Sequence, residues 1–364
     1  ACCWRHNFQQ AGGGQEERSE HGGEDRHVAF FHAAPPRASS NAGRAFPRRG
    51  APARSLRYAT GSPFQNPKSK LQPPPTGYAE HVEDRHGHRI SYLRLSITDR
   101  CNERCRYCLP QEKQEWLPRE GVMSYEEIAR VVRVAAGLGV RKLRVTGGEP
   151  LVRRGVIGLI RALRAIPGIE DIGLSTNGTL LAAPDPEEGT TDTVAQRLAD
   201  AGVRTVNVSL DTLDPASYAL ATGRDYLAKV LAGLDAARTA GIRGIKLNCV
   251  LMRGTNDKAL PDLVDFAHAR GHLMRFIELM PVSRTDVLEE NTFLSTLEAR
   301  QRLEERFGPL VPRPDFRTNG PASYFEVPAR GQLVGFIGAM TNLHFCESCN
   351  KLRLTCDGKL RPCL

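Results

Sequence analysis

The sequence predicts an α/β fold in which a partial barrel of six strand–helix units carries a smaller α+β extension at its C-terminal end. Two observations predict it. Short β-rich runs alternate with amphipathic helical stretches from Ile90 onward, and this alternation stops after Pro281. Repeated strand–helix–strand units require parallel pairing with right-handed crossovers, hence a barrel or an open doubly wound sheet. Six units suit a partial (β/α)6 barrel of the TIM type better than a closed eight-stranded one.

The expected elements follow from the hydrophobic period of each segment. Strands are expected at 90–98, 142–147, 171–176, 205–211, 244–252 and 272–280, and helices at 124–138, 155–166, 192–201, 225–240 and 259–270. The first helix opens with Ser124 and Glu127, which have the spacing of a capping box. The extension is expected to contain a helix near 292–306 and strands at 323–327 and 333–338. In parallel folds of this kind the chemistry is expected at the C-terminal ends of the strands.

The composition of the 364 residues is that of a globular protein, with 50 Lys and Arg against 41 Asp and Glu and a net charge of +9. No window approaches the roughly 18 continuous apolar residues of a membrane-spanning helix, which excludes an integral membrane protein. Much of the positive charge lies in the N-terminal stretch, so it is a weak indication of nucleic-acid binding. The ten cysteines form two clusters plus isolated residues, which favours metal binding over a disulfide scaffold.

Residues 1–85 are expected to be disordered, because they show no hydrophobic period of 2 or 3.6. Between residues 27 and 79 there is no acidic residue but there are eight Lys or Arg, a composition typical of an organellar transit peptide. That predicts a location in the mitochondrial matrix if the source is eukaryotic. The alternative is a bacterial cytoplasmic protein with an N-terminal extension or mistranslated upstream sequence, since five acids lie among residues 16–25. The barrel then spans 86–281 and the C-terminal domain 282–364.

Cys101, Cys105 and Cys108 form a CxxxCxxC motif directly after the first predicted strand. Three thiolates in one loop can coordinate a metal centre, but a closed structural zinc site has four protein ligands. A four-iron cluster held by three cysteines instead leaves one iron open to a small molecule. A zinc site that takes its fourth ligand from a distant His or Cys is the alternative.

This loop, with Tyr107 before its third cysteine, resembles the hallmark motif of the radical SAM superfamily. The run Gly147, Gly148, Glu149 and Pro150 after the second strand supports the resemblance. The resemblance implies a [4Fe-4S] cluster on the three cysteines and S-adenosyl-L-methionine as cofactor, with Gly148 and Glu149 near its methionyl amino group. Two glycines let a backbone approach a ligand closely, although an ordinary tight turn would use them equally.

A second cluster, Cys346, Cys349 and Cys363, again presents three ligands. Its surroundings, FCESCNKLRL and DGKLRPCL, closely resemble the GTP 3′,8-cyclase family of molybdenum cofactor biosynthesis. The resemblance runs over 93–364 and includes LRLSITDRCN, LRVTGGEPLVR, LSTNG, VNVSLDTLD and RFIELMPV. It implies a second [4Fe-4S] cluster whose open iron holds the guanine base. Cys356 departs from the family pattern and is either a bystander or a fourth ligand that would close the site, and Cys249 is interpreted as a buried structural thiol.

The same resemblance assigns the remaining site residues. Those implied to contact the phosphates and ribose of GTP, each expected to project from a strand end toward the barrel mouth, are Arg94, Lys142, Arg144 and Arg275. Lys351 and Arg353, which follow the second cluster, are also assigned to GTP. Those implied to surround S-adenosyl-L-methionine, besides Tyr107, Gly148 and Glu149, are Thr176, Asn177, Ser209, Lys246 and Met280. Lys351 stands where the family usually has arginine, so it keeps the charge but loses the planar fork. For Met280, core packing is the alternative.

The resemblance implies a radical SAM lyase in which Cys101, Cys105, Cys108 and Arg144 are the catalytic residues. A 5′-deoxyadenosyl radical would abstract hydrogen from C3′ of GTP, and the C3′ radical would add to C8 of guanine. The product would pass to a cyclic pyranopterin monophosphate synthase, and the cycle needs an electron donor. A homodimer is compatible with the sequence, and no nucleic-acid partner is expected.

Two other functions compete with this one. A radical SAM peptide-modifying enzyme also carries auxiliary clusters, but usually with more C-terminal cysteines. A non-catalytic zinc or nucleic-acid-binding protein would explain charge and cysteines but not the GGEP run. Family members also continue to a Gly-Gly tail that reaches into the cavity, and this sequence ends at Leu364. The C-terminal domain is therefore expected to be truncated, and the chain to load both clusters but to be a poor catalyst.

Overall fold

The computed structural model describes residues 81–84, 87–108, 115–185, 191–281, 291–342, 344–347 and 349–363. All of them lie in one compact unit, Gly77–Leu364. The transit-peptide candidate lies outside the described residues. The predicted disordered segment 1–85 extends too far, because Val82–Glu83 (β1) pairs antiparallel with Arg89–Ile90 (β2) and the Val82 amide donates to the Leu138 carbonyl at 3.2 Å.

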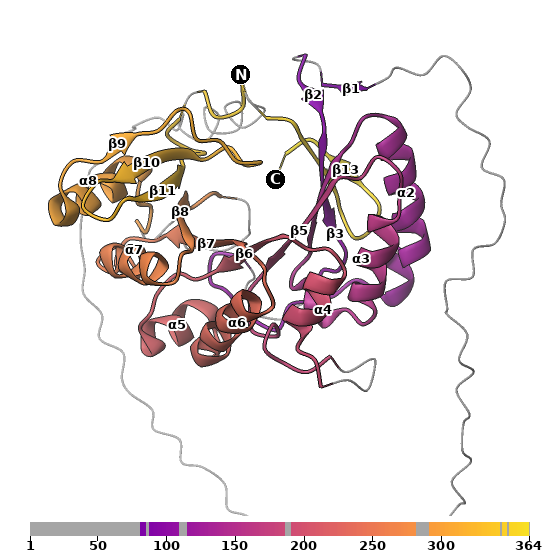
Figure 1. The fold of residues 1–364 in the computed structure, drawn as a ribbon, viewed down its shortest axis with the longest axis horizontal. Coiled ribbons are helices and arrows are strands. Elements are labelled where there is room, and N and C mark those ends of the chain that lie inside the picture. The colour runs from indigo at the N-terminus through magenta and orange to yellow at the C-terminus, as the bar shows by residue number, and fades with distance from the viewer. Residues whose placement is uncertain are drawn as a thin grey trace, which may run out of the picture. The chain divides into compact units, whose positions relative to one another are not determined.

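Six parallel strands form the centre of the main sheet in sequence order, as the alternation of strands and helices predicts. They are β3 (Tyr92–Ser96), β4 (Lys142–Thr146), β5 (Asp171–Thr176), β6 (Thr205–Ser209), β7 (Gly244–Leu251) and β8 (Leu273–Glu278). The helices between them are α2 (Tyr125–Gly137), α3 (Val156–Arg164), α4 (Val194–Asp200), α5 (Pro215–Thr222), α6 (Leu227–Thr239) and α7 (Leu260–Ala269). The helices lie outside the curved sheet (Figure 1), so the partial barrel is confirmed.

The two faces of each strand differ in chemistry. Leu93 and Leu95 of β3 are almost fully buried and belong to the same apolar core as Ile128 and Val132 of α2. Full burial of one such side chain contributes roughly 1.5–3 kcal/mol. Because side chains alternate along a strand, Arg94 between them points to the inner face of the sheet. The inner face is thus free of the helical core and is available for binding.

The helices begin where the sequence indicates. Ser124 and Glu127 form the predicted capping box of α2, with bonds in both directions. Helix α5 was not predicted, because its eight residues are too few to show an amphipathic period; it begins at the cap Asp214 and ends at Gly223, whose φ is 66°. Two short 3-10 turns, Arg119–Gly121 and Pro150–Val152, complete the helical elements of the described chain. None of the described helices combines the length and the apolar composition needed to cross a membrane.

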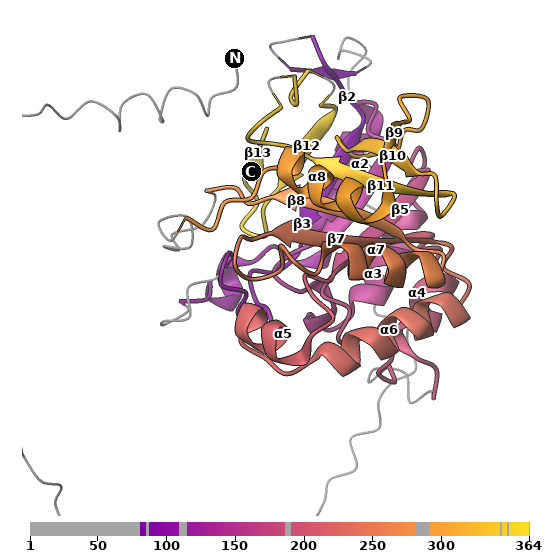
Figure 2. The same ribbon diagram turned by 90° about the vertical axis from the view of Figure 1, so that its left-hand side faces the viewer.

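The C-terminal segment extends both edges of the same sheet. Its elements are α8 (Thr296–Phe307), β9 (Val311–Pro312), β10 (Ser323–Val327), β11 (Gln332–Ile337), β12 (Lys351–Leu354) and β13 (Leu360–Arg361). Strand β11 is parallel to β8, and β12 is parallel to β3 at the opposite edge. Figures 1 and 2 show these two arms beside the barrel strands. The predicted extension therefore flanks the barrel rather than following it, and β12 brings its residues to the inner face.

Candidate active site

A cavity of about 330 Å³ lies against the inner face of the sheet. This volume is at the lower end of the range in which proteins bind small ligands. The residues lining it that the sequence singles out are Arg94, Cys101, Cys105, Tyr107, Cys108, Arg144, Gly148, Thr176, Asn177, Ser209, Lys246, Arg275 and Lys351. The structure thus brings together most of the predicted site from segments far apart in the sequence.

Several predicted residues lie outside that lining, within the described part of the chain. They are Glu149, Lys142, Met280, Arg353, Cys346, Cys349 and Cys363. Glu149 is buried behind Gly148, and Lys142 is the first residue of β4. Met280 is half-buried after β8. Arg353 belongs to β12, close to the second set of cysteines in the sequence.

The cysteine loop after β3 is fastened to helix α5. The backbone amide of Arg104 donates to the carbonyl of Thr222 at 2.8 Å. A side-chain link adds to it, because the hydroxyl of Tyr218 donates to the buried carboxylate of Glu103. The loop that carries the three thiols is therefore held by a helix that the sequence analysis did not predict.

The three thiols of this loop share the cavity. Burial raises the pKa of Cys101 to about 11, and it also raises the pKa of Cys105 and of Cys108. A bound metal centre would lower the pKa of these thiols, because its positive charge stabilises the thiolate.

Within the described ranges, no three His, Cys, Asp or Glu side chains are arranged to hold a single metal ion. A four-iron cluster needs only the three cysteines of this loop, whereas a closed zinc site would need a fourth protein ligand.

The glycine pair after β4 packs on the start of the cysteine loop. A Cβ added at Gly148 would lie 2.4 Å from the carbonyl oxygen of Arg100 and 2.6 Å from that of Asp99. The amide of Gly148 donates to the Thr98 carbonyl at 2.8 Å, and that of Glu149 donates to the Arg100 carbonyl at 2.8 Å. A larger residue at 148 would push the two loops apart, so this glycine is required by their contact whether or not a ligand approaches it.

Buried Glu149 organises the end of β5. Its carboxylate accepts hydrogen bonds from the Thr176 hydroxyl at 2.8 Å, the Asn177 amide at 2.7 Å and the Leu151 amide at 3.0 Å. Burial raises the pKa of Glu149 to about 7, although these bonds favour the charged form. The side chain of Asn177 in turn donates to that of Asn102 in the cysteine loop at 2.8 Å. Three predicted cofactor-binding residues thus form one network behind the thiols.

Two acidic residues of the site were missed by sequence reasoning. Asp211 accepts a hydrogen bond from the Tyr107 hydroxyl at 3.0 Å and one from the Val250 amide at 2.8 Å. Burial raises the pKa of Asp211 to about 6, and burial raises the pKa of Glu103 to about 7. The sequence contained a signal for each. Asp211 is an acid at the end of an apolar predicted strand, and Glu103 is an acid between Cys101 and Cys105.

The predicted GTP-binding cations lie deeper in the barrel than expected. Arg94 and Arg144 are the third residues of their strands and pair in register with each other, and Arg353 of β12 pairs with Arg94. Lys142 is at the N-terminal end of β4. The expectation that these residues project from strand ends toward the mouth is therefore wrong, because the inward positions of a strand occur at several depths. Arg94, Arg144 and Arg275 form a cationic layer in the same cavity as the three thiols.

Arg144 in this layer is held by uncharged groups. Its Nε donates to the Tyr92 hydroxyl at 2.9 Å, and its Nη1 donates to the carbonyls of Leu174 at 3.1 Å and Thr205 at 3.2 Å. The side chain is only 3% exposed. Its positive charge is thus fixed in position and remains available to an anion.

Burial and repulsion between like charges disfavour the charged forms of Arg94 and of the neighbouring Lys246. Burial, then the charge of Arg353, lowers the pKa of Arg94 to about 10; burial, then the charges of Arg275 and Arg144, lowers the pKa of Lys246 to about 8. The Nε of Arg94 is buried without a hydrogen-bond partner among the described residues. An unpaired buried donor costs free energy, so this layer favours a ligand with several negative charges.

Two free thiols of the second set, Cys349 and Cys363, lie near the cations of β12. In their thiolate form, Cys349 and Cys363 lie close enough to Arg353 to attract its positive charge. Cys349 also lies close enough to attract the charge of Lys351. Burial lowers the pKa of both cations. Cys356 instead has carboxylates as its nearest charged groups, which favours its interpretation as a bystander.

Comparisons with known proteins agree with this geometry. A family model described as the Radical SAM superfamily matches residues 95–267, and one described as Molybdenum Cofactor Synthesis C matches 272–364. A GTP 3′,8-cyclase of Erythrobacter litoralis is 45% identical over 288 residues, which cover 79% of this chain and 82% of that protein. A GTP 3′,8-cyclase of Moorella thermoacetica is 45% identical over 283 residues, which cover 78% and 84%. Both relatives are bacterial, so the predicted mitochondrial location has no support.

Among solved structures, SuiB of Streptococcus suis bound to S-adenosylmethionine resembles this chain with a TM-score of 0.54 and 17% sequence identity. The match covers 77% of this chain and 62% of that chain. At this identity the similarity concerns the fold alone, and it agrees with the partial parallel barrel.

Proposed function

Because this chain belongs to the GTP 3′,8-cyclase family of the radical SAM superfamily, we propose that it converts GTP to (8S)-3′,8-cyclo-7,8-dihydroguanosine 5′-triphosphate, the first step of molybdenum cofactor biosynthesis. The observation that carries the proposal is the layer formed by Arg94, Arg144 and Arg275, which lines the same cavity as the cysteine loop. A triphosphate offers these cations several charges at once, and it would satisfy the unpaired Nε of Arg94.

The family implies a four-iron cluster and S-adenosyl-L-methionine, and the residues of the loop fit them. Cys101, Cys105 and Cys108 would hold the cluster. When bound, the cluster and its cofactor would supply the one-electron chemistry that removes a hydrogen atom from the ribose of GTP. The chain contributes orientation: Glu103 and Tyr218 hold the loop, while the network of Glu149 holds the Thr176–Asn177 turn.

Arg94, Arg144, Arg275 and Lys142 would bind the phosphates and the ribose of GTP. The remaining cofactor contacts that we propose are Tyr107, Gly148, Ser209, Lys246 and Met280. Tyr107 is oriented by its hydrogen bond to Asp211. Enclosure between the sheet and the 319–321 segment would keep water away from the reacting atoms.

We also propose that Cys346, Cys349 and Cys363 hold a second four-iron cluster whose open iron binds guanine, beside Lys351 and Arg353. The position of Cys349 and Cys363 near Arg353 supports this. Iron and sulfide analysis tests it: Cys349→Ser should hold about half the iron of the unaltered chain, and Cys356→Ser should hold all of it. Full iron in the first variant, or a loss in the second, would refute the ligand set.

The test of the activity is anaerobic turnover of the reconstituted protein with GTP or ATP. We expect a cyclised product from GTP only, because a site that recognises guanine would bind adenine poorly. The alternative, a peptide-modifying enzyme, predicts no product from GTP and would be favoured by that result.

The remaining assignments complete the proposal. The product would pass to a cyclic pyranopterin monophosphate synthase, a separate electron donor would reduce the first cluster, and the chain could act as a homodimer. Since the relatives named above are bacterial, we propose the bacterial cytoplasm as the location. A functional division near residue 281 would place the first set of thiols before it and the second set after it.

A further inference from the structure

Asn319 stands between two neighbours on adjacent strands at the N-terminal edge of the sheet. Lys142 of β4 and Asp171 of β5 pair in register. The Nζ of Lys142 donates to Oδ1 of Asn319 at 2.7 Å, and Nδ2 of Asn319 donates to Oδ2 of Asp171 at 3.1 Å. Because an ammonium can only donate and a carboxylate only accept, the two partners also determine which way the amide faces.

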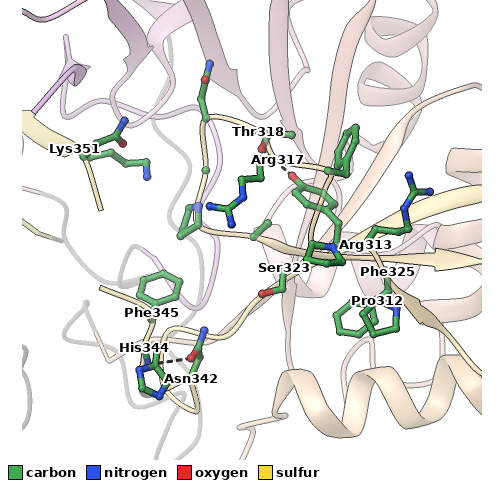
Figure 3. A pocket seen from close by; sticks show the side chains of 18 residues that line it. Pro312, Arg313, Arg317, Thr318, Ser323, Phe325, Asn342, His344, Phe345 and Lys351 are labelled. Carbon is green, nitrogen blue, oxygen red and sulfur yellow. Dashed lines mark hydrogen bonds between the residues drawn. The ribbon is translucent and has the colours of Figure 1, made fainter. Parts of the chain in front are cut away.

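Asn319 belongs to a segment, 318–321, that lies between two cavities. Asn319, Gly320 and Pro321 line the reaction cavity on one side and a second cavity of about 560 Å³ on the other. Figure 3 shows the second cavity, with Arg317 and Lys351 among the side chains around it. A Cβ added at Gly320 would lie 3.7 Å from Nη1 of Arg275. The segment is therefore bonded to Lys142 and lies beside Arg275, two of the proposed GTP-binding cations.

The chemistry of Asn319 explains why an amide is suited to this place. A cross-strand lysine and aspartate attract each other, and a lysine neutralised by a carboxylate binds phosphate less well. The amide occupies both partners with hydrogen bonds while adding no charge. Lys142 is thus bonded to a neutral amide and not to the carboxylate of Asp171, and the wall formed by 318–321 stays attached to the sheet.

We propose that Asn319 is a positioning residue for the phosphate site, which keeps Lys142 separated from Asp171 and directed to the nucleotide. The inference rests on the proposed function, since it assumes that GTP is the ligand. In the absence of the amide, Lys142 would pair with Asp171, and the phosphate site would lose one of the cations proposed for it.

The test measures the dissociation constant of GTP with the full chain, reconstituted anaerobically. Asn319→Ala should weaken GTP binding about tenfold, the effect of one charged hydrogen bond, and leave the affinity for S-adenosyl-L-methionine unchanged. Thr318→Ala is the matched control. It removes the bond between the Thr318 and Tyr324 hydroxyls, 2.9 Å long, and so loosens the same segment without touching Lys142.

A rescue separates positioning from a merely structural role. Asp171→Asn added to Asn319→Ala removes the carboxylate that captures Lys142, so GTP affinity should return to within about threefold of the unaltered chain. Asn319→Asp keeps the size of the side chain but neutralises Lys142, so it should weaken binding even if the alanine variant fails to fold.

Three results would overturn the inference alone: unchanged GTP affinity in Asn319→Ala or Asn319→Asp, an equal loss in Thr318→Ala, or no rescue by Asp171→Asn. Absence of GTP binding by the unaltered chain would overturn the proposed function, and this inference with it.

Discussion

A Cβ added to Gly173 would lie 2.3 Å from Nη1 of Arg144 and 2.5 Å from Oγ1 of Thr205. Gly173 on β5 pairs in register with Arg144 on β4. The missing side chain therefore opens the space into which the guanidinium extends to reach its carbonyl partners. The need for glycine here is steric, since the approach is far closer than real Cβ contacts. Gly173 thus determines the direction of Arg144.

Gly173→Ala should displace the guanidinium of Arg144 and lower GTP turnover by at least about tenfold, the effect of losing one charged hydrogen bond. Cleavage of S-adenosyl-L-methionine without GTP should continue, because the cysteine loop lies on another strand end. Gly137→Ala in α2 is the control, since nothing lies within 4 Å of its added Cβ. Equal GTP turnover in both variants would show that the placement of Arg144 does not depend on Gly173.

Arg144→Lys tests whether the planar guanidinium group of Arg144 is required, whereas the preceding substitution tests its position. Lysine keeps the charge, but it cannot reproduce the bonds to Tyr92, Leu174 and Thr205 at once. We expect kcat/KM for GTP to fall roughly 10- to 100-fold, the equivalent of about 1.5–3 kcal/mol. Arg130→Lys on the exposed face of α2 serves as the control. Unchanged GTP kinetics in Arg144→Lys would mean that charge alone suffices.

The order of the barrel strands could be predicted from sequence because each strand and helix has its own hydrophobic period. The depth at which each inward side chain lies in the barrel could not be predicted in this way. Alternation shows that Arg94, Arg144 and Arg275 share the inner face, but the stagger of neighbouring strands decides at what height each lies. Strand β12 was missed for a related reason. Lys351–Leu354 pairs in parallel with β3, which is far away in the sequence, so the local sequence pattern does not indicate this pairing.

The thiols of the first loop were recognisable because metal ligands need a fixed spacing along the chain. Their support was not recognisable. Glu103 and Tyr218 are 115 positions apart in sequence, and helix α5, which joins them, is too short to show a period. Asn319 is comparable, since its partners Lys142 and Asp171 are separated from it by well over a hundred residues. Such contacts follow from tertiary packing alone.

Tyr218→Phe should destabilise the chain by about 1–3 kcal/mol, because the buried Glu103 carboxylate loses its hydroxyl donor. The change should be visible as a lower midpoint in denaturant and as faster loss of iron from the reconstituted protein, since the bond fastens the cysteine loop. Tyr226→Phe, on a half-buried tyrosine that contacts Lys229, controls for the loss of a phenol elsewhere. An equal effect of the two substitutions would argue against a special role for the pair of Glu103 and Tyr218.

The pH dependence of stability should have a contribution from His272, which precedes β8 and is 4% exposed. Burial, followed by the charges of Arg270 and Arg238, lowers the pKa of His272 to about 4. Its Nε2 has no hydrogen-bond partner among the described residues, so nothing compensates a proton placed there. In the unfolded chain a histidine binds a proton near pH 6.5. Between these two values only the unfolded state is protonated.

Stability should therefore fall as the pH is lowered from about 6.5 to about 4, by roughly 3 kcal/mol from this residue, because the unfolded state binds the additional proton. His272→Gln removes the titrating ring and should flatten this part of the profile of unfolding free energy against pH. His268→Gln, at an exposed position of α7, should leave the slope as it is in the unaltered chain. If the slope between pH 6.5 and 4 is the same in all three proteins, acid sensitivity arises elsewhere, and the buried carboxyl groups Glu149 and Asp211 cannot supply it. Their pKa values are raised by burial, so their protonation favours the folded state as the pH falls.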